Sequence, residues 1–244
     1  MPRAGLDPVA VVTAGADLAD EVGLSGLTMG LLAERLGVRT PSLYKHVVSL
    51  DALHRGIALL AARDVGLVLA RAAVGKAGPE AVRALAHAYR HWALEHPGRC
   101  AATVRPPAAA AEKAAAAEKA AAAEKAAAAE KTVTAGKAAA AAKTAAGEKA
   151  AAAEKAAGDG KAAGDEEIRT VSEEALQVLL DVLAGLGLPP ERIIDAARAL
   201  RAAMHGFAGL EAAGGFGYPE DVDRSYDFLI DSLIAGFTAR PADQ

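Results

Sequence analysis

The sequence predicts an all-α fold with an N-terminal helix-turn-helix domain, a larger C-terminal helical domain and a low-complexity insertion. Apolar residues recur every three to four positions along most of the chain, and no segment alternates as a β-strand does. Proline, glycine, serine and threonine stand where helices would begin or end. The predicted domains are residues 1–60, residues 61–107 together with 166–240, and a repeat spacer over 108–165.

Four helices are expected in the first 75 residues. Pro8 follows Asp7 and begins a helix that ends at Gly23, with a predicted apolar face of Val9, Val12, Ala16, Ala19 and Val22. Thr28 caps a second helix over 29–36, which ends at Gly37. Thr40 before Pro41 predicts the cap of a short third helix containing residues 42–46. Ser49 caps a fourth helix that continues to about Arg71.

The C-terminal domain is expected to hold helices over 79–96, 99–104, 166–186, 191–213 and 219–237. The helix over 79–96 has one apolar face, made of Val82, Leu85, Tyr89 and Trp92. In the last helix Ile230 and Ile234 widen the apolar stripe beyond Leu229 and Leu233. The helix before it carries small residues that would let another helix approach: Ala199, Ala202, Ala203, Gly206, Gly209 and Ala213. Together these features predict a two-fold dimer through the last two helices, although tight packing within one subunit is the alternative.

The insertion is an alanine-rich repeat with a period of six residues. Residues 108–161 contain 30 alanines among 54 residues, and lysine recurs every sixth position from Lys113 to Lys161. Alanine favours helix, so the first identical units are expected to be helical, with later glycines such as Gly147, Gly158 and Gly164 interrupting the helix. One large apolar side chain in the block, Val133, cannot form a core. We expect a solvated spacer without chemistry, arising by natural expansion or by engineered insertion.

Composition excludes several classes of protein. A net charge of −4 argues against coating of nucleic acid through bulk charge. One cysteine, Cys100, cannot form an internal disulfide and fits a reducing compartment. The N-terminus lacks the apolar region of a secretory signal, and no run reaches the length of a membrane span. We therefore expect a cytoplasmic protein with no membrane partner.

Residues 27–47 fit the spacing of a helix-turn-helix. Ala33 supplies the small residue where two helices meet, Gly37 the turn residue that tolerates positive φ, and Leu43 the buried aliphatic of the second helix. Leu32, Leu36 and Val38 would fill the core between them.

A local positive edge accompanies this motif. Residues 35–50 contain no acid but include Arg35, Arg39, Lys45 and His46, which suits contacts with phosphates. The chain is therefore expected to bind double-stranded DNA sequence-specifically and to regulate transcription. The predicted DNA-binding residues are Thr28, Arg39, Thr40, Pro41, Ser42, Tyr44, Lys45 and His46.

The same stretch, with LAERLGV followed by PSLYKHV, resembles the N-terminal domain of the tetracycline-repressor (TetR) family. The resemblance implies an all-helical homodimer on a pseudo-palindromic operator, and a repressor that a small molecule releases from DNA. Gly30 and Leu50 depart from the family, since many relatives carry a basic residue there. The string Met204-His205-Gly206-Phe207 resembles the Trp-His-Gly signature of one branch, with methionine in place of tryptophan.

Candidate ligand-binding residues lie on helices expected to surround a pocket: Tyr89, Trp92, Met204 and Phe207. Plain core packing is the alternative for each of them. A second possibility is a metal-responsive regulator, because His87, His91, His96 and Cys100 follow one another at spacings of four, five and four. The sequence has no nucleophile elbow, phosphate-binding glycine loop or zinc-protease helix, so neither an enzyme nor a cofactor is expected.

Overall fold

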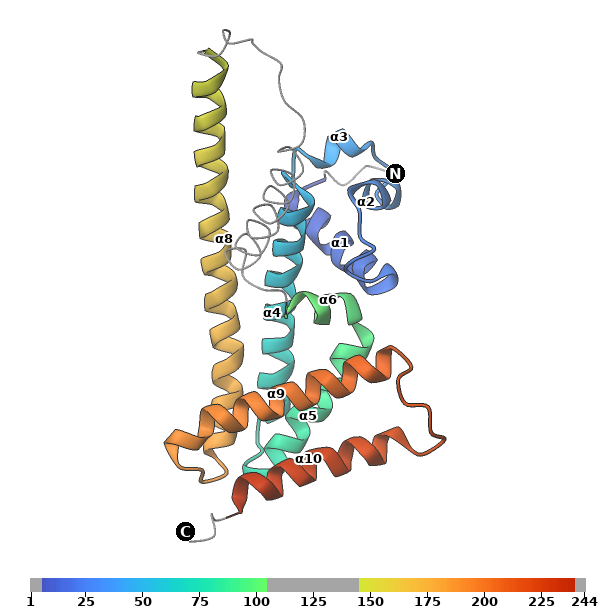
Figure 1. Cartoon of the computed structure of the whole chain (residues 1–244), viewed down its shortest axis with the longest axis vertical. Helices are drawn as coiled ribbons and strands as arrows, with labels where there is room; N and C mark the ends of the chain where they lie inside the picture. The colour runs from blue at the N-terminus through green and yellow to red at the C-terminus, as the bar shows by residue number, and fades with distance from the viewer. Residues whose placement is uncertain (1–5, 105–144, 240–244) are drawn as a thin grey trace, which may run out of the picture. The chain divides into compact units, whose positions relative to one another are not determined.

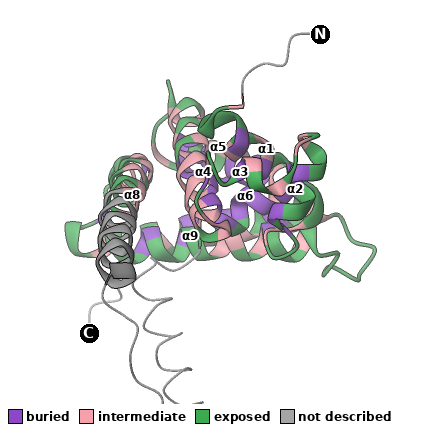
Figure 2. Cartoon of the chain, turned by 90° about the horizontal axis from the view of Figure 1, so that it is seen from above, coloured by how far each residue is buried: buried purple, intermediate pink, exposed green. Residues whose placement is uncertain are grey.

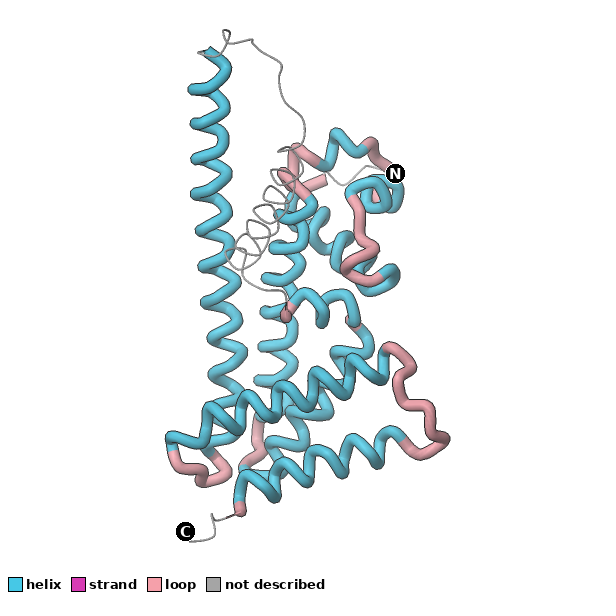
Figure 3. Tube along the Cα trace, in the orientation of Figure 1, coloured by secondary structure: helices cyan, strands magenta, loops and turns pink. Residues whose placement is uncertain are grey.

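The computed structural model describes residues 6–104 and 145–239, and from residue 164 onward the second range includes side chains. In these ranges the chain is all helical, as predicted, with turns between the helices (Figures 1 and 3). The helices are α1 (Pro8–Val22), α2 (Met29–Arg35), α3 (Thr40–Leu43), α4 (Leu50–Ala73), α5 (Gly78–Glu95), α6 (Pro97–Ala102), α8 (Ala145–Ala184), α9 (Pro190–Ala212) and α10 (Val222–Thr238). Contacts between Cα atoms divide the chain into residues 1–104 with 167–244, and residues 105–166.

The N-terminal helices α1, α2 and α3 pack with the start of α4 around a small core. Fully buried aliphatic side chains hold it together: Val11, Leu27, Leu32, Leu43, Leu53 and Ile57. Three helix starts follow the predicted capping chemistry, because Asp7, Thr28 and Ser49 each accept a backbone N–H three residues ahead. Local side-chain chemistry therefore sets where α1, α2 and α4 begin.

Two expectations for these helices are wrong. Of the predicted face of α1, Ala16 and Ala19 are buried, but Val9 is 72% exposed and Val22 43% exposed. Val11 and Leu18 are buried as well, so the apolar face is only partly the predicted one. The reason is that α1 packs against both α4 and α6 and buries a broader strip. Thr40 is the first residue of α3 and not its cap, since Arg39 occupies the cap position without a side-chain hydrogen bond.

The C-terminal core brings together α5, α6, α9, α10, the second half of α4 and the end of α8. Figure 2 shows buried residues along α4, α5, α6 and α9. The predicted face of α5 is confirmed, since Val82, Leu85, Tyr89 and Trp92 are all buried. Helix α4 serves both cores: Leu53 and Ile57 lie in the N-terminal core, and Ala61, Val65 and Leu69 in the C-terminal one. The boundary proposed at residue 60 stays a prediction.

Helix α8 is longer than the sequence predicts. It begins at Ala145 rather than at Glu166 and runs through Gly147, Gly158, Gly160 and Gly164 without a break. Each glycine costs about 1 kcal/mol relative to alanine, but the alanines between them favour helix. The expected interruption is therefore wrong over 145–164, and the remainder of the predicted spacer, residues 108–144, lies outside the described residues. After residue 167 the helix buries Leu179, Val182 and Leu183 in the C-terminal core.

Candidate nucleic-acid interface

The turn between α2 and α3 has the geometry that its sequence predicts. Gly37 has φ of +64°, the backbone conformation that glycine adopts without strain. The Val38 N–H donates to the Ala33 carbonyl and the Gly37 N–H donates to the Glu34 carbonyl, both at 3.0 Å. This pair of bonds is the Schellman arrangement that ends a helix. It directs the chain away from α2 at a fixed angle and into α3.

Short helix α3 and the turn after it are anchored from the inside. Leu43 is fully buried and Val47 is 6% exposed, and both belong to the N-terminal core. Between these anchors Tyr44 remains 50% exposed. The anchors thus hold residues 44–46 against the core from one side and leave the other side open to a partner.

The eight predicted DNA-binding side chains all reach the surface of this region. Thr28, Arg39, Pro41, Tyr44 and Lys45 are exposed, and Thr40, Ser42 and His46 are half-buried. Thr28 also has a structural role, because its hydroxyl accepts the Leu31 N–H at 3.2 Å. Whether these residues contact DNA stays a prediction.

Fewer positive charges are available for DNA in this region than the number of basic residues in the sequence suggests. The Arg35 guanidinium pairs with the Glu21 carboxylate of α1 at 2.6 Å, with both side chains exposed. The hydrogen bond from Arg35 lowers the pKa of Glu21, and the same bond raises the pKa of Arg35. Arg39 and Lys45 have no ion pair with another described residue. The available positive charge therefore lies at the two ends of the α3 region and not on α2.

Two features of this surface were missed from the sequence. The pairing of Arg35 with Glu21 joins residues 14 positions apart, and nothing local signals it. Val48, which follows the buried Val47, is 75% exposed. Its apolar side chain therefore lies at the surface beside the predicted DNA-binding residues.

Helix α6 fastens the N-terminal core to the C-terminal one. The Arg99 N–H donates to Asp20 at 2.9 Å, the His96 ring lies 3.2 Å from the same carboxylate, and the Arg99 guanidinium pairs with Asp17. A side chain at Gly98 would place its Cβ 2.2 Å from the Ala19 carbonyl. Backbone therefore rests on backbone where α6 meets α1, and only glycine fits there.

The predicted ligand residues lie in the C-terminal core. Tyr89, Trp92 and Met204 are buried, and Phe207 is half-buried. The Tyr89 hydroxyl lies 2.9 Å from Nδ1 of His205 and 3.6 Å from Sγ of Cys100, so side chains of α5, α6 and α9 meet there. Burial raises the pKa of Tyr89 and of Cys100, and burial followed by the charge of Arg201 lowers the pKa of His205.

Phe207 belongs to an aromatic cluster around a buried arginine. Its ring centroid lies 4.6 Å from that of Phe216 and 4.9 Å from that of Tyr226. The Arg90 guanidinium lies 5.7 Å from the same ring and binds Glu211 through two hydrogen bonds of 2.7 and 2.6 Å. The contacts of Phe207 within the described residues are thus those of a packed core residue, and its ligand role stays a prediction.

The histidine and cysteine spacing does not produce a metal site. His87 pairs with Asp227 and His91 with Glu95 on exposed surface, whereas His96 faces Asp20 and Cys100 faces His205. Within residues 6–104 and 164–239, no three His, Cys, Asp or Glu side chains gather to hold a metal ion. The helical spacing therefore places the four residues around different neighbours.

Parts of the chain are similar to known proteins. The family described as "Tetracyclin repressor-like, C-terminal domain" matches residues 148–233. An uncharacterized HTH-type transcriptional regulator of Bacillus subtilis is 35% identical over 97 residues, which are 40% of this chain and 51% of that protein. Another from Mycobacterium tuberculosis is 38% identical over 104 residues, which are 43% of this chain and 48% of that protein. The chain therefore spans about half the length of these relatives.

The fold also matches solved structures. A TetR variant from Acinetobacter baumannii, solved in complex with minocycline, superposes with a TM-score of 0.57 over 96% of this chain and 97% of that one, at 20% identity. The arrangement of helices is thus the all-helical fold of that structure. Residues 148–233 are similar to the TetR-like C-terminal domain, and parts of the chain are similar to HTH-type transcriptional regulators. The proteins that the chain resembles are described as transcriptional regulators. No helix of the described residues is long and apolar enough to cross a membrane.

Proposed function

We propose that this protein binds a specific DNA operator and represses transcription until a small molecule releases it. The surface around α3 supports this proposal most directly. Leu43 and Val47 anchor the segment in the core, while Tyr44 and Lys45 stay exposed beside it. An anchored segment whose cations have no ion pair within residues 6–104 and 164–239 suits contacts with base edges and phosphates. Such a regulator would act in the cytoplasm, where its DNA is.

Selection of bound duplexes from a random pool tests DNA binding directly. Repeated rounds with the full chain should enrich one pseudo-palindromic sequence, and footprinting should then show protection of both halves. Recovery of unrelated sequences with equal affinity would contradict sequence-specific binding.

We infer that the working form is a homodimer through α9 and α10. Helix α9 exposes Ala199, Ala202, Gly206 and Gly209, and Ala213 directly after it is exposed as well. A Cβ added at Gly206 or Gly209 would meet no atom within 4 Å. On α10, Phe228 is 75% exposed. A small-residue face on α9 and an exposed aromatic on α10 suit close packing of a second copy. Two recognition segments would then read two half-sites about 34–36 Å apart.

One argument for the dimer has to be corrected. Ile230 and Ile234 are 1% and 5% exposed and pack in the chain's own core with Tyr226, so they do not widen a stripe toward a partner. Leu229 and Leu233 are half-buried. The exposed small residues and Phe228 now support the dimer in their place.

We also infer a ligand site near Tyr89, Trp92, Met204 and Phe207, and a C-terminal domain of the Trp-His-Gly branch. The Trp92 indole nitrogen is buried and has no hydrogen-bond partner among the described residues, so it could donate to an acceptor on a ligand. The Tyr89 hydroxyl and His205 ring supply further polar groups in an otherwise apolar region. Replacing Trp92 by phenylalanine should weaken ligand-induced release from DNA and leave operator binding unchanged.

A further inference from the structure

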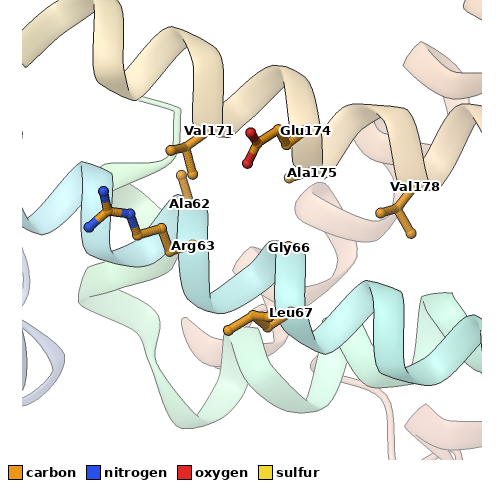
Figure 4. A pocket seen from close by; sticks show the side chains of 8 residues that line it. All are labelled: Ala62, Arg63, Gly66, Leu67, Val171, Glu174, Ala175 and Val178. Atoms are coloured by element: carbon orange, nitrogen blue, oxygen red, sulfur yellow. The ribbon is translucent and has the colours of Figure 1, made fainter.

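A cleft between α4 and α8 lies apart from the ligand residues considered above. Its volume is about 340 Å³, at the lower end of the roughly 300–1,000 Å³ typical of small-molecule sites. Figure 4 shows its walls, with Ala62 and Leu67 on α4 and Val171 and Val178 on α8. Most of the lining is apolar, and Leu67 is 56% exposed, so water covers apolar surface that a ligand could bury.

The cleft exists because α4 and α8 meet through their smallest residues. A Cβ added to Gly66 would lie 3.3 Å from the Cβ of Ala175, which is a tight contact. On one side of this point the Arg63 guanidinium binds Glu167 at 2.6 Å. The larger side chains that line the cleft, among them Leu67, Val171 and Val178, surround this contact and leave an open space next to it.

The charges of the cleft favour a positively charged ligand. Two ionisable side chains line it, Arg63 and Glu174. Arg63 is neutralised by its ion pair with Glu167. Glu174 has no ion pair with any described residue. The cleft therefore keeps one uncompensated negative charge, and the rest of its lining is mostly apolar.

We propose that this cleft binds a small organic cation, with its charged group beside Glu174 and its apolar body against Leu67, Val171 and Val178. The binding itself needs no DNA. Its use as the signal that releases the operator rests on the proposed function. Helix α4 connects the two regions, since it lines the cleft and begins at Leu50, shortly after His46, the last of the predicted DNA-binding residues.

Isothermal titration of the full chain with octyltrimethylammonium tests the site, with octanesulfonate as the anion of equal chain length. The cation should bind and the sulfonate should bind much more weakly. Glu174→Gln should weaken binding of the cation about two- to fivefold, the range of a partly exposed ion pair. Glu173→Gln is the matched control, because Glu173 pairs with Arg169 and does not line the cleft. It should leave the affinity unchanged.

A further variant tests the apolar part of the cleft. Leu67→Ser removes an exposed apolar side chain from the cleft without disturbing the core. It should weaken binding of the cation several-fold and leave the thermal midpoint unchanged. Equal binding of cation and sulfonate, or full affinity in Glu174→Gln, would overturn the proposal. All these titrations are done without DNA, so their failure is separate from failure of the operator selection.

Discussion

At the scale of single residues, Tyr44 and Lys45 provide the clearest test of the proposed DNA interface. Both are exposed, so replacing either by alanine should leave the thermal midpoint nearly unchanged. Each change should weaken operator binding by about 1–2 kcal/mol, and loss of a phosphate contact at Lys45 should lower the salt slope by about one unit. Gel-shift titrations at several salt concentrations measure both effects. Lys76→Ala, in the exposed turn after α4, is the control and should change neither.

His205 gives the fold a pH dependence. Burial lowers its pKa below the ordinary 6.5, so the folded protein keeps the ring neutral while the unfolded chain takes up a proton. Stability from this residue is therefore present above pH 6.5 and is lost as the pH falls toward the folded pKa. Urea unfolding at pH 7.5, 6.5 and 5.5 should show wild type losing more stability than His205→Asn. Parallel losses in the two proteins would contradict a neutral, buried imidazole.

At the scale of helices, Arg90 joins α5 to α9 and α10. Its side chain is 10% exposed, and it binds Glu211, which is 21% exposed, as well as Asp223. Arg90→Ala leaves the Glu211 carboxylate half-buried without its partner, and it should cost about 3 kcal/mol of unfolding free energy. Arg83 on the same helix pairs with Asp231 where both side chains are about half exposed. Arg83→Ala should cost under about 1 kcal/mol by the same chemical denaturation.

Gly98 tests the junction between α6 and α1. Its added Cβ would lie 2.2 Å from the Ala19 carbonyl, so Gly98→Ala has to move one helix and should destabilise the fold by about 2 kcal/mol or more. Gly164 on α8 meets no atom within 4 Å, and there alanine should be neutral or stabilising by up to about 1 kcal/mol. Thermal unfolding of the two variants compares them. Equal thermal midpoints for the two variants would mean that α6 and α1 can move apart at Gly98 without a loss of stability.

Sequence reasoning predicted the elements whose signals are local. Caps at Asp7, Thr28 and Ser49 are read from neighbours three residues away, and the face of α5 is visible as a periodic pattern. The start of α8 was missed because alanine and glycine show no buried face. The bonds of Arg99 to α1 and of Arg90 to Glu211 join residues 79 to 121 positions apart, so no local pattern marks them. The candidate DNA surface was also predictable from local sequence. Its buried residues, Leu43 and Val47, and its exposed residues, Tyr44 and Lys45, lie within one short segment.

At the scale of the whole molecule, the predicted dimer depends on a surface that one subunit leaves uncovered. Phe228→Glu should produce monomers in sedimentation velocity runs at micromolar concentration, because it would place a charge against the partner. Operator affinity should fall with it, since each half-site then binds alone. The change should leave the fold of the subunit intact, because Phe228 is 75% exposed. Leu233→Glu is a poorer choice, since Leu233 packs against the chain's own core. A wild-type monomer that binds its operator tightly would contradict the dimer.

The ion pairs between α1 and α6 also limit how this protein could be built into a hybrid regulator. A chimaera joined near residue 60 would keep Arg99 on its own helix but would bring a foreign first helix beneath it. Arg99 is 8% exposed, and without Asp17 and Asp20 its charge would lie nearly buried and uncompensated. The first helix of a donor domain would also have to let its backbone approach Gly98 as closely as the backbone of Ala19 does. Exchange of DNA-reading domains should therefore succeed with donors that carry both carboxylates at the matching positions of their first helix, and fail with those that do not.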